Sequence, residues 1–78
     1  MPRYTEQKII TYLEICDYIP LLFHRPNAGA LFIEEDMSGQ WVNTKVFRKT
    51  GKYKIFVKGK KLRFTPSENV AYTVPEGT

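Results

Sequence analysis

The chain has 78 residues and a net charge of +4, with twelve Lys or Arg against eight Asp or Glu. A chain of this length makes one domain, residues 1–78, and buries only roughly 60 to 65 per cent of its unfolded surface, which argues against a large enzyme cleft. One cysteine and one histidine exclude a disulfide framework and a His/Cys metal cluster, so we expect no cofactor and no metal.

The sequence shows no pattern that is typical of a signal peptide or a membrane span. No segment combines a basic start, an apolar run and a small-residue cleavage site, and no apolar run approaches the length of a membrane span. The lack of a cysteine framework fits a reducing compartment. We therefore expect a soluble, cytoplasmic protein that has no membrane partner.

The first predicted element is the only helix, within residues 2–18. Thr5 is a candidate N-cap, and Glu6 in the first turn carries a charge that suits the helix dipole. An apolar stripe at helical spacing consists of Ile9, Ile10, Leu13 and Cys16. Pro20 ends the helix, and Cys16 is expected to be a small buried apolar group.

Short strands follow the helix. Residues 21–24 form an apolar run, in which His24 is interpreted as a strand residue, and residues 30–34 form a second run. Residues 35–40 are expected to be a polar loop. The carboxylates Glu34, Glu35 and Asp36 could hold magnesium or calcium, but we favour a solvated acidic loop because neighbours on a strand point to opposite faces.

Residues 41–65 carry the strongest functional signal. Thr50-Gly51 and Gly59-Lys60 each predict a two-residue hairpin loop, which joins three strands into one antiparallel sheet. The two registers agree, since they place Ile55 opposite Val46 in one hairpin and opposite Phe64 in the other. A three-residue loop with a bulge at Gly51 is the alternative for the first turn. After Pro66, residues 70–74 are predicted to form an edge strand.

Alternation along the three strands separates an apolar face from a face on which cations and aromatic rings interleave. The chain supplies most of its positive charge here, because residues 45–78 carry nine Lys or Arg against two acidic residues. Phe56 is expected opposite Arg63, in reach of a cation–π contact. The predicted site residues are Trp41, Lys45, Phe47, Lys54, Phe56, Lys58, Lys61 and Arg63.

These observations predict an α+β domain, with one N-terminal helix packed on a mostly antiparallel sheet of four to five strands. Basic side chains would neutralise phosphates and the rings would stack on bases, so we expect a nucleic-acid-binding protein, with DNA favoured over RNA. The alternative is a protein-interaction or regulatory module that forms a homodimer or larger homo-oligomer through the same face.

Residues 5–41 also carry a set of short motifs in a characteristic order. Thr5-Glu6 opens the segment, Arg25-Pro26-Asn27-Ala28-Gly29 follows the apolar run, and Gly39-Gln40-Trp41 comes next. This part of the chain resembles the opening of the virus-type replication-repair nuclease domain (VRR-NUC) of the PD-(D/E)xK superfamily. The resemblance suggests a phage or mobile-element origin.

The resemblance implies that Glu6 matches a glutamate supporting the metal site of that family, and that Arg25, Asn27 and Gly29 match its Arg-x-Asn-x-Gly segment. No Pro-Asp pair and no Glu-x-Lys triplet, the family's metal-holding motifs, follow residue 41. Hydrolysis in that superfamily requires a carboxylate-held metal. We therefore expect a protein that is not an enzyme on its own.

Overall fold

The computed structural model describes residues 2–12 and 17–76, which form strands and contain no helix. The protein is therefore all-β over the described residues, and the predicted α+β class is wrong. The strands are β1 (Arg3–Tyr4), β2 (Lys8–Tyr12), β3 (Tyr18–His24), β4 (Leu31–Met37), β5 (Gln40–Phe47), β6 (Gly51–Phe56), β7 (Lys60–Pro66) and β8 (Ala71–Thr73).

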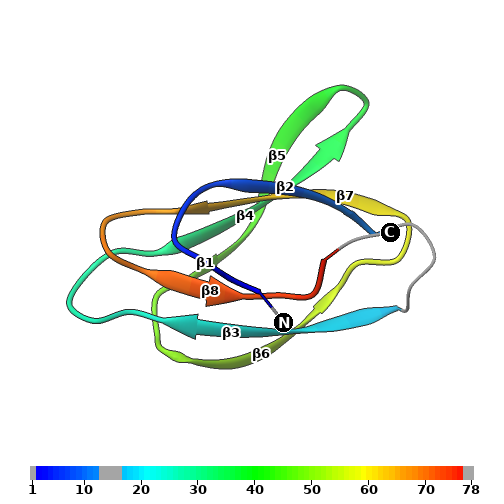
Figure 1. Ribbon diagram of the computed structural model, residues 1–78. Coiled ribbons are helices and arrows are strands. Elements are labelled where there is room, and N and C mark those ends of the chain that lie inside the picture. Colours follow the sequence, from blue (N-terminus) through cyan, green and yellow to red (C-terminus); the bar gives the residue numbers. More distant parts are fainter. Residues whose placement is uncertain (1, 13–16, 77–78) are drawn as a thin grey trace.

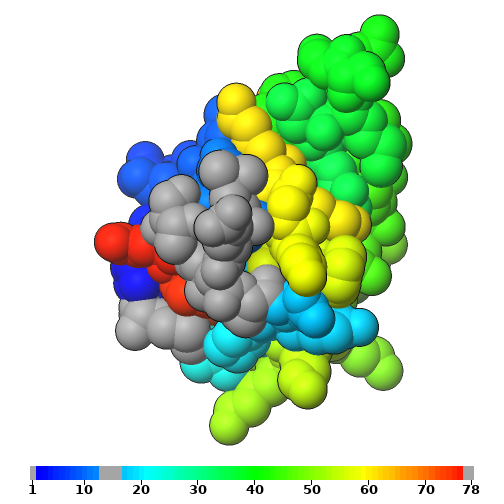
Figure 2. Space-filling view, turned by 90° about the vertical axis from the view of Figure 1, so that its right-hand side faces the viewer, coloured from blue at the N-terminus to red at the C-terminus, as the bar shows by residue number. Residues whose placement is uncertain are grey.

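The strands form two four-stranded antiparallel sheets that pack face to face (Figure 1). Sheet I has the order β1-β8-β3-β6, and sheet II has the order β2-β7-β4-β5. Consecutive strands alternate between the sheets except at the β4–β5 hairpin. That hairpin projects from the body of the protein, as the space-filling view in Figure 2 shows in green.

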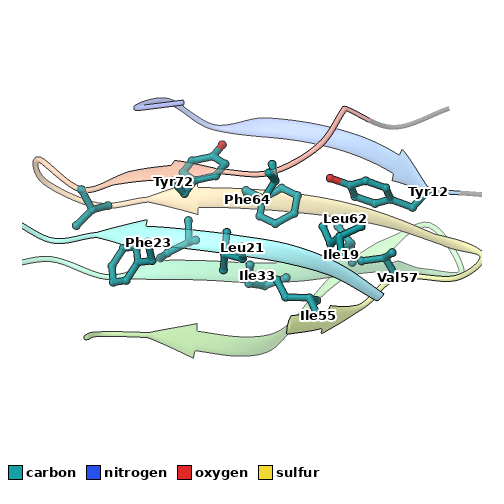
Figure 3. Close-up of a cluster of buried hydrophobic side chains, with 13 residues drawn as sticks. Tyr12, Ile19, Leu21, Phe23, Ile33, Ile55, Val57, Leu62, Phe64 and Tyr72 are labelled. Atoms are coloured by element: carbon teal, nitrogen blue, oxygen red, sulfur yellow. The ribbon is translucent and has the colours of Figure 1, made fainter. Parts of the chain in front are cut away.

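The core fills the space between the two sheets (Figure 3). Sheet I contributes every second residue of β3, and sheet II contributes alternate residues of β4 and β7, as expected for strands buried on one face. The largest fully buried side chains are Tyr12, Tyr72, Phe23, Phe64, Ile19, Leu21, Leu31, Ile33, Ile55, Leu62, Val57 and Val70.

Two buried tyrosines close the core on the side of the chain termini. The Tyr72 ring stacks on Phe64, with centroids 5.5 Å apart, and its hydroxyl donates to the Glu6 carbonyl at 2.7 Å. The Tyr12 hydroxyl donates to the Pro75 carbonyl, also at 2.7 Å. Both rings are thus buried without leaving a hydroxyl unsatisfied, which is the usual requirement for a buried tyrosine.

The predicted N-terminal helix is replaced by strands β1 and β2. Exposure alternates from Ile9, which is exposed, through Ile10, which packs against the core, to Tyr12, which is buried. Over such a short run, an apolar pattern fits a helix and a strand equally well. The β-branched and aromatic residues here favour a strand once a sheet is available for pairing. Leu13 and Cys16 lie outside the described residues.

The strand pairing predicted for the two hairpins of residues 41–65 is also wrong. β5 pairs with β4 and β6 pairs with β3, so β5, β6 and β7 do not form one three-stranded sheet. Residues 48–50 instead cross from sheet II to sheet I, and the Thr50 hydroxyl accepts a hydrogen bond from the Arg25 amide at 2.9 Å. Turn residues show where the chain reverses, but they do not determine which strand becomes the partner.

The second predicted turn exists, shifted by one residue. The Lys60 amide donates to the Val57 carbonyl at 3.0 Å, and Gly59 takes a positive φ of 70°. This turn connects the two sheets. Ile55 and Val57 therefore enter the core from one side, while Leu62 and Phe64 enter it from the other. The prediction that these four residues are buried together is confirmed, although they belong to facing layers.

The remaining strand predictions hold in part. Residues 21–24 fall within β3 as predicted, and residues 31–34 of the predicted run 30–34 fall within β4, which begins at Leu31. Residues 70–74 contain β8, which lies between β1 and β3 and is not an edge strand. The predicted polar loop at 35–40 is a tight hairpin turn, because β4 and β5 are separated only by Ser38 and Gly39, both with positive φ.

The described residues include no helix that is long and apolar enough to cross a membrane.

Candidate nucleic-acid interface

The eight predicted site residues do not share one face. Lys54 and Phe56 lie on the outer face of β6, with Lys58 just beyond it, so these three belong to sheet I. Lys61 and Arg63 lie on the outer face of β7 and belong to sheet II. Since the two sheets enclose one core, Lys54 and Arg63 point away from it on opposite sides.

A β-bulge further divides the predicted residues of β5. The register shifts between Ile33 and Glu34, so Thr44 has no residue directly opposite, and its hydroxyl donates to the Ile33 carbonyl at 3.2 Å. Trp41 and Asn43 pair with Asp36 and Glu34, which lie on the outward side. Lys45 and Phe47 pair with Ile33 and Leu31, which face the core. Strict alternation, assumed in the prediction, fails at such a bulge.

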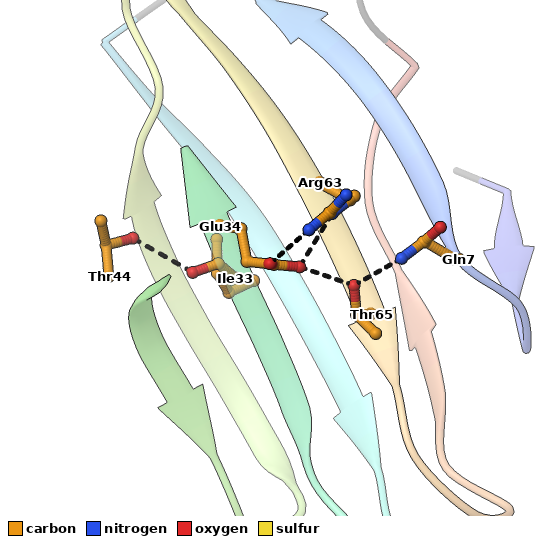
Figure 4. Close-up of polar contacts among 6 residues, drawn as sticks. All are labelled: Gln7, Ile33, Glu34, Thr44, Arg63 and Thr65. Carbon is orange, nitrogen blue, oxygen red and sulfur yellow. Dashed lines mark hydrogen bonds and ion pairs between the residues drawn. The ribbon is translucent and has the colours of Figure 1, made fainter. Parts of the chain in front are cut away.

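The outer face of sheet II is held together by an ion-pair network (Figure 4). Arg63 binds Glu34 through two hydrogen bonds, from Nε at 2.9 Å and from Nη2 at 2.6 Å. The Thr65 hydroxyl donates to the same carboxylate at 2.8 Å, and Gln7 donates to Thr65 at 3.0 Å. The hydrogen bonds from Arg63 lower the pKa of Glu34 and raise the pKa of Arg63.

Trp41 belongs to the same network. The Arg63 guanidinium carbon lies 4.7 Å from the centre of the Trp41 ring, a cation–π contact in place of the predicted one with Phe56. Lys60 pairs with Glu35 at 3.0 Å. Arg63 and Lys60 are therefore neutralised by neighbouring carboxylates, and the predicted acidic loop is largely paired. A phosphate would have to compete with those carboxylates for either cation.

The outer face of sheet I has a different composition. None of its four strands contains an acidic residue, whereas β4 in sheet II contains three. Buried Ile19, Leu21 and Phe23 alternate along β3 with residues that point outward, and buried Ile55 sets the same alternation in β6. The outward side chains are Arg3, Tyr18, Pro20, Leu22, His24, Lys52, Lys54 and Phe56.

Two aromatic rings mark one end of this face. Tyr18 and Phe56 are paired in the β3–β6 ladder and meet edge to face, with ring centroids 5.4 Å apart. Tyr18 is 54% exposed and Phe56 is 42% exposed. The Lys54 ammonium lies 5.8 Å from the Tyr18 ring, and the Lys60 ammonium lies 5.2 Å from the Phe56 ring. Exposed rings suit stacking on bases, and Lys54 supplies a cation beside them, whereas Lys60 is paired with Glu35.

A groove of about 500 Å³ marks the opposite end of the same face. Its lining draws on all four strands of sheet I and on the segment that enters β6. The lining residues are Arg3, Leu22, Phe23, His24, Thr50, Gly51, Lys52, Ala71 and Thr73. Three of them carry basic side chains, two carry hydroxyl groups, and none is acidic. The groove is therefore suited to an anion.

We define the sheet I face as Arg3, Tyr18, Leu22, His24, Lys52, Lys54, Phe56 and Lys58. Sequence reasoning identified Lys54, Phe56 and Lys58 but missed the others. The signal for β3 was present, because Tyr18, Pro20, Leu22 and His24 alternate with apolar residues. The predicted helix included Tyr18, the first residue of β3, so the outward residues of β3 were not included in the predicted site. Alternation along β6 also places Lys52 on this face, whereas Arg3 joins it only through the sheet pairing.

The residues matching the nuclease resemblance do not assemble a metal site. Glu6 lies between β1 and β2 instead of within a helix, and its carboxylate is 3.5 Å from the Lys8 ammonium. Arg25 donates to the Arg48 carbonyl at 2.6 Å, at the crossing between the sheets. Asn27 and Gly29 lie in the β3–β4 connection. The described residues contain no group of three His, Cys, Asp or Glu able to hold a metal ion.

Comparison with known proteins finds no matching family, no matching curated protein and no matching solved structure.

Proposed function

We propose that this chain is a small nucleic-acid-binding protein, without catalytic activity of its own, and that it binds through the sheet I face. The observation that supports the proposal most strongly is the segregation of charge between the sheets. Arg3, His24, Lys52 and Lys54 lie on strands that contain no carboxylate, and the same face carries two exposed aromatic rings. DNA is the first ligand to test.

Two forces of different origin would act on the same ligand. Lysine and arginine side chains neutralise phosphates and release counterions, which gives an affinity that falls steeply with salt. Tyr18 and Phe56 offer stacking surfaces for bases, a contribution of about 1 to 3 kcal/mol per base. Lys58 contributes less than Lys54, because its ammonium is 3.6 Å from the Asp17 carboxylate.

The outer face of sheet II is the weaker candidate. Its central arginine, Arg63, is held by Glu34 and covers Trp41, so binding a phosphate there would require this network to break. The hydrogen bonds of a charged pair are worth more than those between neutral groups, and losing one partner leaves the other unsatisfied. The network is better explained as a structural feature of sheet II.

A pair of charge-matched double variants tests the proposal. Lys52→Glu/Lys54→Glu reverses two charges on the sheet I face, and Lys45→Glu/Lys61→Glu reverses two exposed charges on strands of sheet II. Both variants change the net charge by the same amount. Binding to a fluorescein-labelled oligonucleotide is measured by anisotropy at several salt concentrations, after circular dichroism has confirmed that both variants are folded.

The Lys52→Glu/Lys54→Glu protein is expected to bind at least tenfold more weakly, and its salt slope should fall by about 0.7 for each phosphate that the protein no longer neutralises. The sheet II variant should retain most of its affinity, with a smaller loss from the change in net charge. Equal losses in the two variants, or no binding by the wild-type protein, would contradict the proposal.

Self-association is a second candidate function, favoured by the β4–β5 hairpin. Among the described strands β5 pairs only with β4, and Met37 and Val42 on this hairpin are exposed. Exposed edges can pair with another copy, although the bulge and Lys45 oppose such pairing. Sedimentation velocity over a range of concentrations tests it: a dimer that Val42→Lys dissociates supports this function, and a monomer throughout excludes it.

A further inference from the structure

We propose that the ligand is a single strand, and that the groove beside Gly51 holds one of its phosphates while Tyr18 and Phe56 stack on its bases. This inference rests on the proposed function and specifies its substrate class. It is drawn from the arrangement of two unlike binding features at the two ends of one strand pair, β3 and β6.

The groove has the chemistry of a phosphate site. Arg3, His24 and Lys52 come from three different strands, β1, β3 and β6, and all three line it. Their N–H groups would donate to phosphate oxygens, and the hydroxyl groups of Thr50 and Thr73 can do the same. Arginine matches the geometry of a phosphate especially well, because its planar fork can donate two parallel hydrogen bonds.

Apolar side chains form part of the base of the groove. Ala71 is buried, whereas Leu22 is 37% exposed, and both lie on the central strands β8 and β3. Leu22 pairs with Lys52 on one side and with Thr73 on the other. The basic side chains of Arg3, His24 and Lys52 are exposed, so an anion can reach all three from solvent.

The groove and the rings are linked along a single ladder. The pairs Leu22–Lys52, Pro20–Lys54 and Tyr18–Phe56 follow one another on the outer face of sheet I. His24 lies six positions after Tyr18, or about 20 Å away at the rise of an extended strand. Lys54 lies between the two ends. One extended nucleic-acid strand running along β3 and β6 would contact the groove, Lys54 and the rings in turn.

The rings favour a single strand over a duplex. In a duplex each base is already stacked on its neighbours, so an aromatic side chain can stack only at an end or after unstacking. Reading a duplex through its major groove requires an element that enters the groove, such as a helix or a two-stranded ribbon. Tyr18 and Phe56 lie instead on the face of a four-stranded sheet.

The test compares one oligonucleotide with its own duplex. A 12-nucleotide labelled DNA strand and the same strand annealed to its complement are titrated with the full chain, and dissociation constants come from fluorescence anisotropy. The variants are Phe56→Ala for the rings and Arg3→Gln/His24→Gln for the groove. The matched controls are Trp41→Ala, an aromatic residue of sheet II, and Lys61→Gln, an exposed cation of sheet II.

The wild-type protein is expected to bind the single strand at least tenfold more tightly than the duplex. Phe56→Ala should weaken single-strand binding between about 5-fold and about 150-fold, which is the range for loss of one stacking ring. Arg3→Gln/His24→Gln should weaken it more than Lys61→Gln does, and the salt slope should fall by about 0.7 for each phosphate left without a cation. Trp41→Ala should have little effect.

The alternative results separate this inference from the proposed function. The inference is overturned, with nucleic-acid binding left in place, if the protein binds the duplex as tightly as the single strand. It is also overturned if Phe56→Ala binds the single strand no more weakly than Trp41→Ala does. A groove variant indistinguishable from Lys61→Gln overturns the phosphate site. No binding of either form overturns the proposed function together with the inference.

Discussion

Tyr18 lies directly opposite Phe56 in the β3–β6 ladder, and their rings meet edge to face at an angle of 72°. The next pair in the ladder, Ile19 and Ile55, is buried, so both rings point out of the sandwich. Edge-to-face pairs are worth about 0.5 to 1.5 kcal/mol beyond burial, and this contact restrains both rings. A ligand would thus meet rings that are already oriented.

The alternation of buried and exposed residues along β3 predicts a large loss of stability at one leucine and a small loss at the next. Leu21→Ala removes a fully buried side chain and should destabilise the protein by about 2 to 5 kcal/mol. Leu22→Ala makes the same change on the outer face and should cost less than about 1 kcal/mol. Urea denaturation followed by tryptophan fluorescence measures both. Equal costs for the two variants would show that β3 does not have this register.

Gly29 holds a backbone conformation that a side chain would disturb. Its φ is +107°, and an added Cβ would lie 2.6 Å from the Ser67 carbonyl oxygen. Ser67 is fixed there, because its amide donates to the Ala30 carbonyl at 2.9 Å.

Gly29→Ala should therefore lower stability by at least about 2 kcal/mol, since strain of about 1 to 3 kcal/mol adds to the clash. Gly39→Ala provides the control, because Gly39 also has positive φ but its Cβ would meet open space. Thermal melting should show the larger loss for Gly29→Ala, and the reverse order would contradict this conformation.

The ion pair of Glu34 with Arg63 predicts a stability that depends on pH. The pKa of Glu34 is lowered from its ordinary value of 4.5, chiefly by the hydrogen bonds from Arg63. The stabilisation it supplies is complete above that ordinary value and is lost as the pH falls through the lowered folded value.

Glu34→Gln should therefore melt at a lower temperature than the wild-type protein at about pH 7. The difference should shrink as the pH falls through the lowered pKa of Glu34, because a protonated Glu34 is uncharged like glutamine. Glu68→Gln, an exposed carboxylate, is the control. A melting difference that stays constant over this range would show that the charge of Glu34 does not contribute.

The buried hydroxyl of Tyr72 predicts a stability that falls as the pH rises into the alkaline range. Burial, together with the nearby Tyr4 and Glu6, raises the pKa of its hydroxyl above the ordinary value of 10.0. A group with a raised folded pKa stabilises the fold below its unfolded value, and this contribution falls as the pH rises beyond it.

Tyr72→Phe loses the bond to the Glu6 carbonyl and should cost about 0.5 to 1.5 kcal/mol at neutral pH. The gap to the wild-type protein should narrow above about pH 10, because phenylalanine cannot ionise. Melting curves at pH 7 and about pH 11 measure this stability difference between the two proteins. A difference that widens with pH would contradict the raised pKa of Tyr72.

Burial could be predicted from the sequence better than pairing. Ile55, Val57, Leu62 and Phe64 were predicted to face the core and do so, because alternation is a local property of each strand. Which strand each would pair with depends on contacts between distant residues. Leu22 pairs with Lys52 and Thr73, which are 30 and 51 positions away in the chain.

The candidate site was predicted in part for the same reason. Lys54 and Phe56 are neighbours on one strand, so alternation alone places them on one face. Tyr18, which pairs with Phe56, and Arg3, which pairs with Thr73, come from residues 2–18, whose short apolar pattern fitted a helix. Trp41 and Arg63 were assigned to the same face as Lys54. The crossing at residues 48–50 separates Trp41 from Lys54, and the turn between β6 and β7 separates Arg63 from it.

The central claim is that a nucleic-acid strand lies along β3 and β6. Backbone amide chemical shifts, measured by NMR while the labelled protein is titrated with a 12-nucleotide single strand, test it most directly. We predict that the shifts concentrate on β1, β3, β6 and the Thr50–Gly51 segment, with Phe56 and Lys52 among the most affected. Shifts centred on β4, β5 and β7 around Trp41 and Arg63, or no shifts at all, would contradict the account.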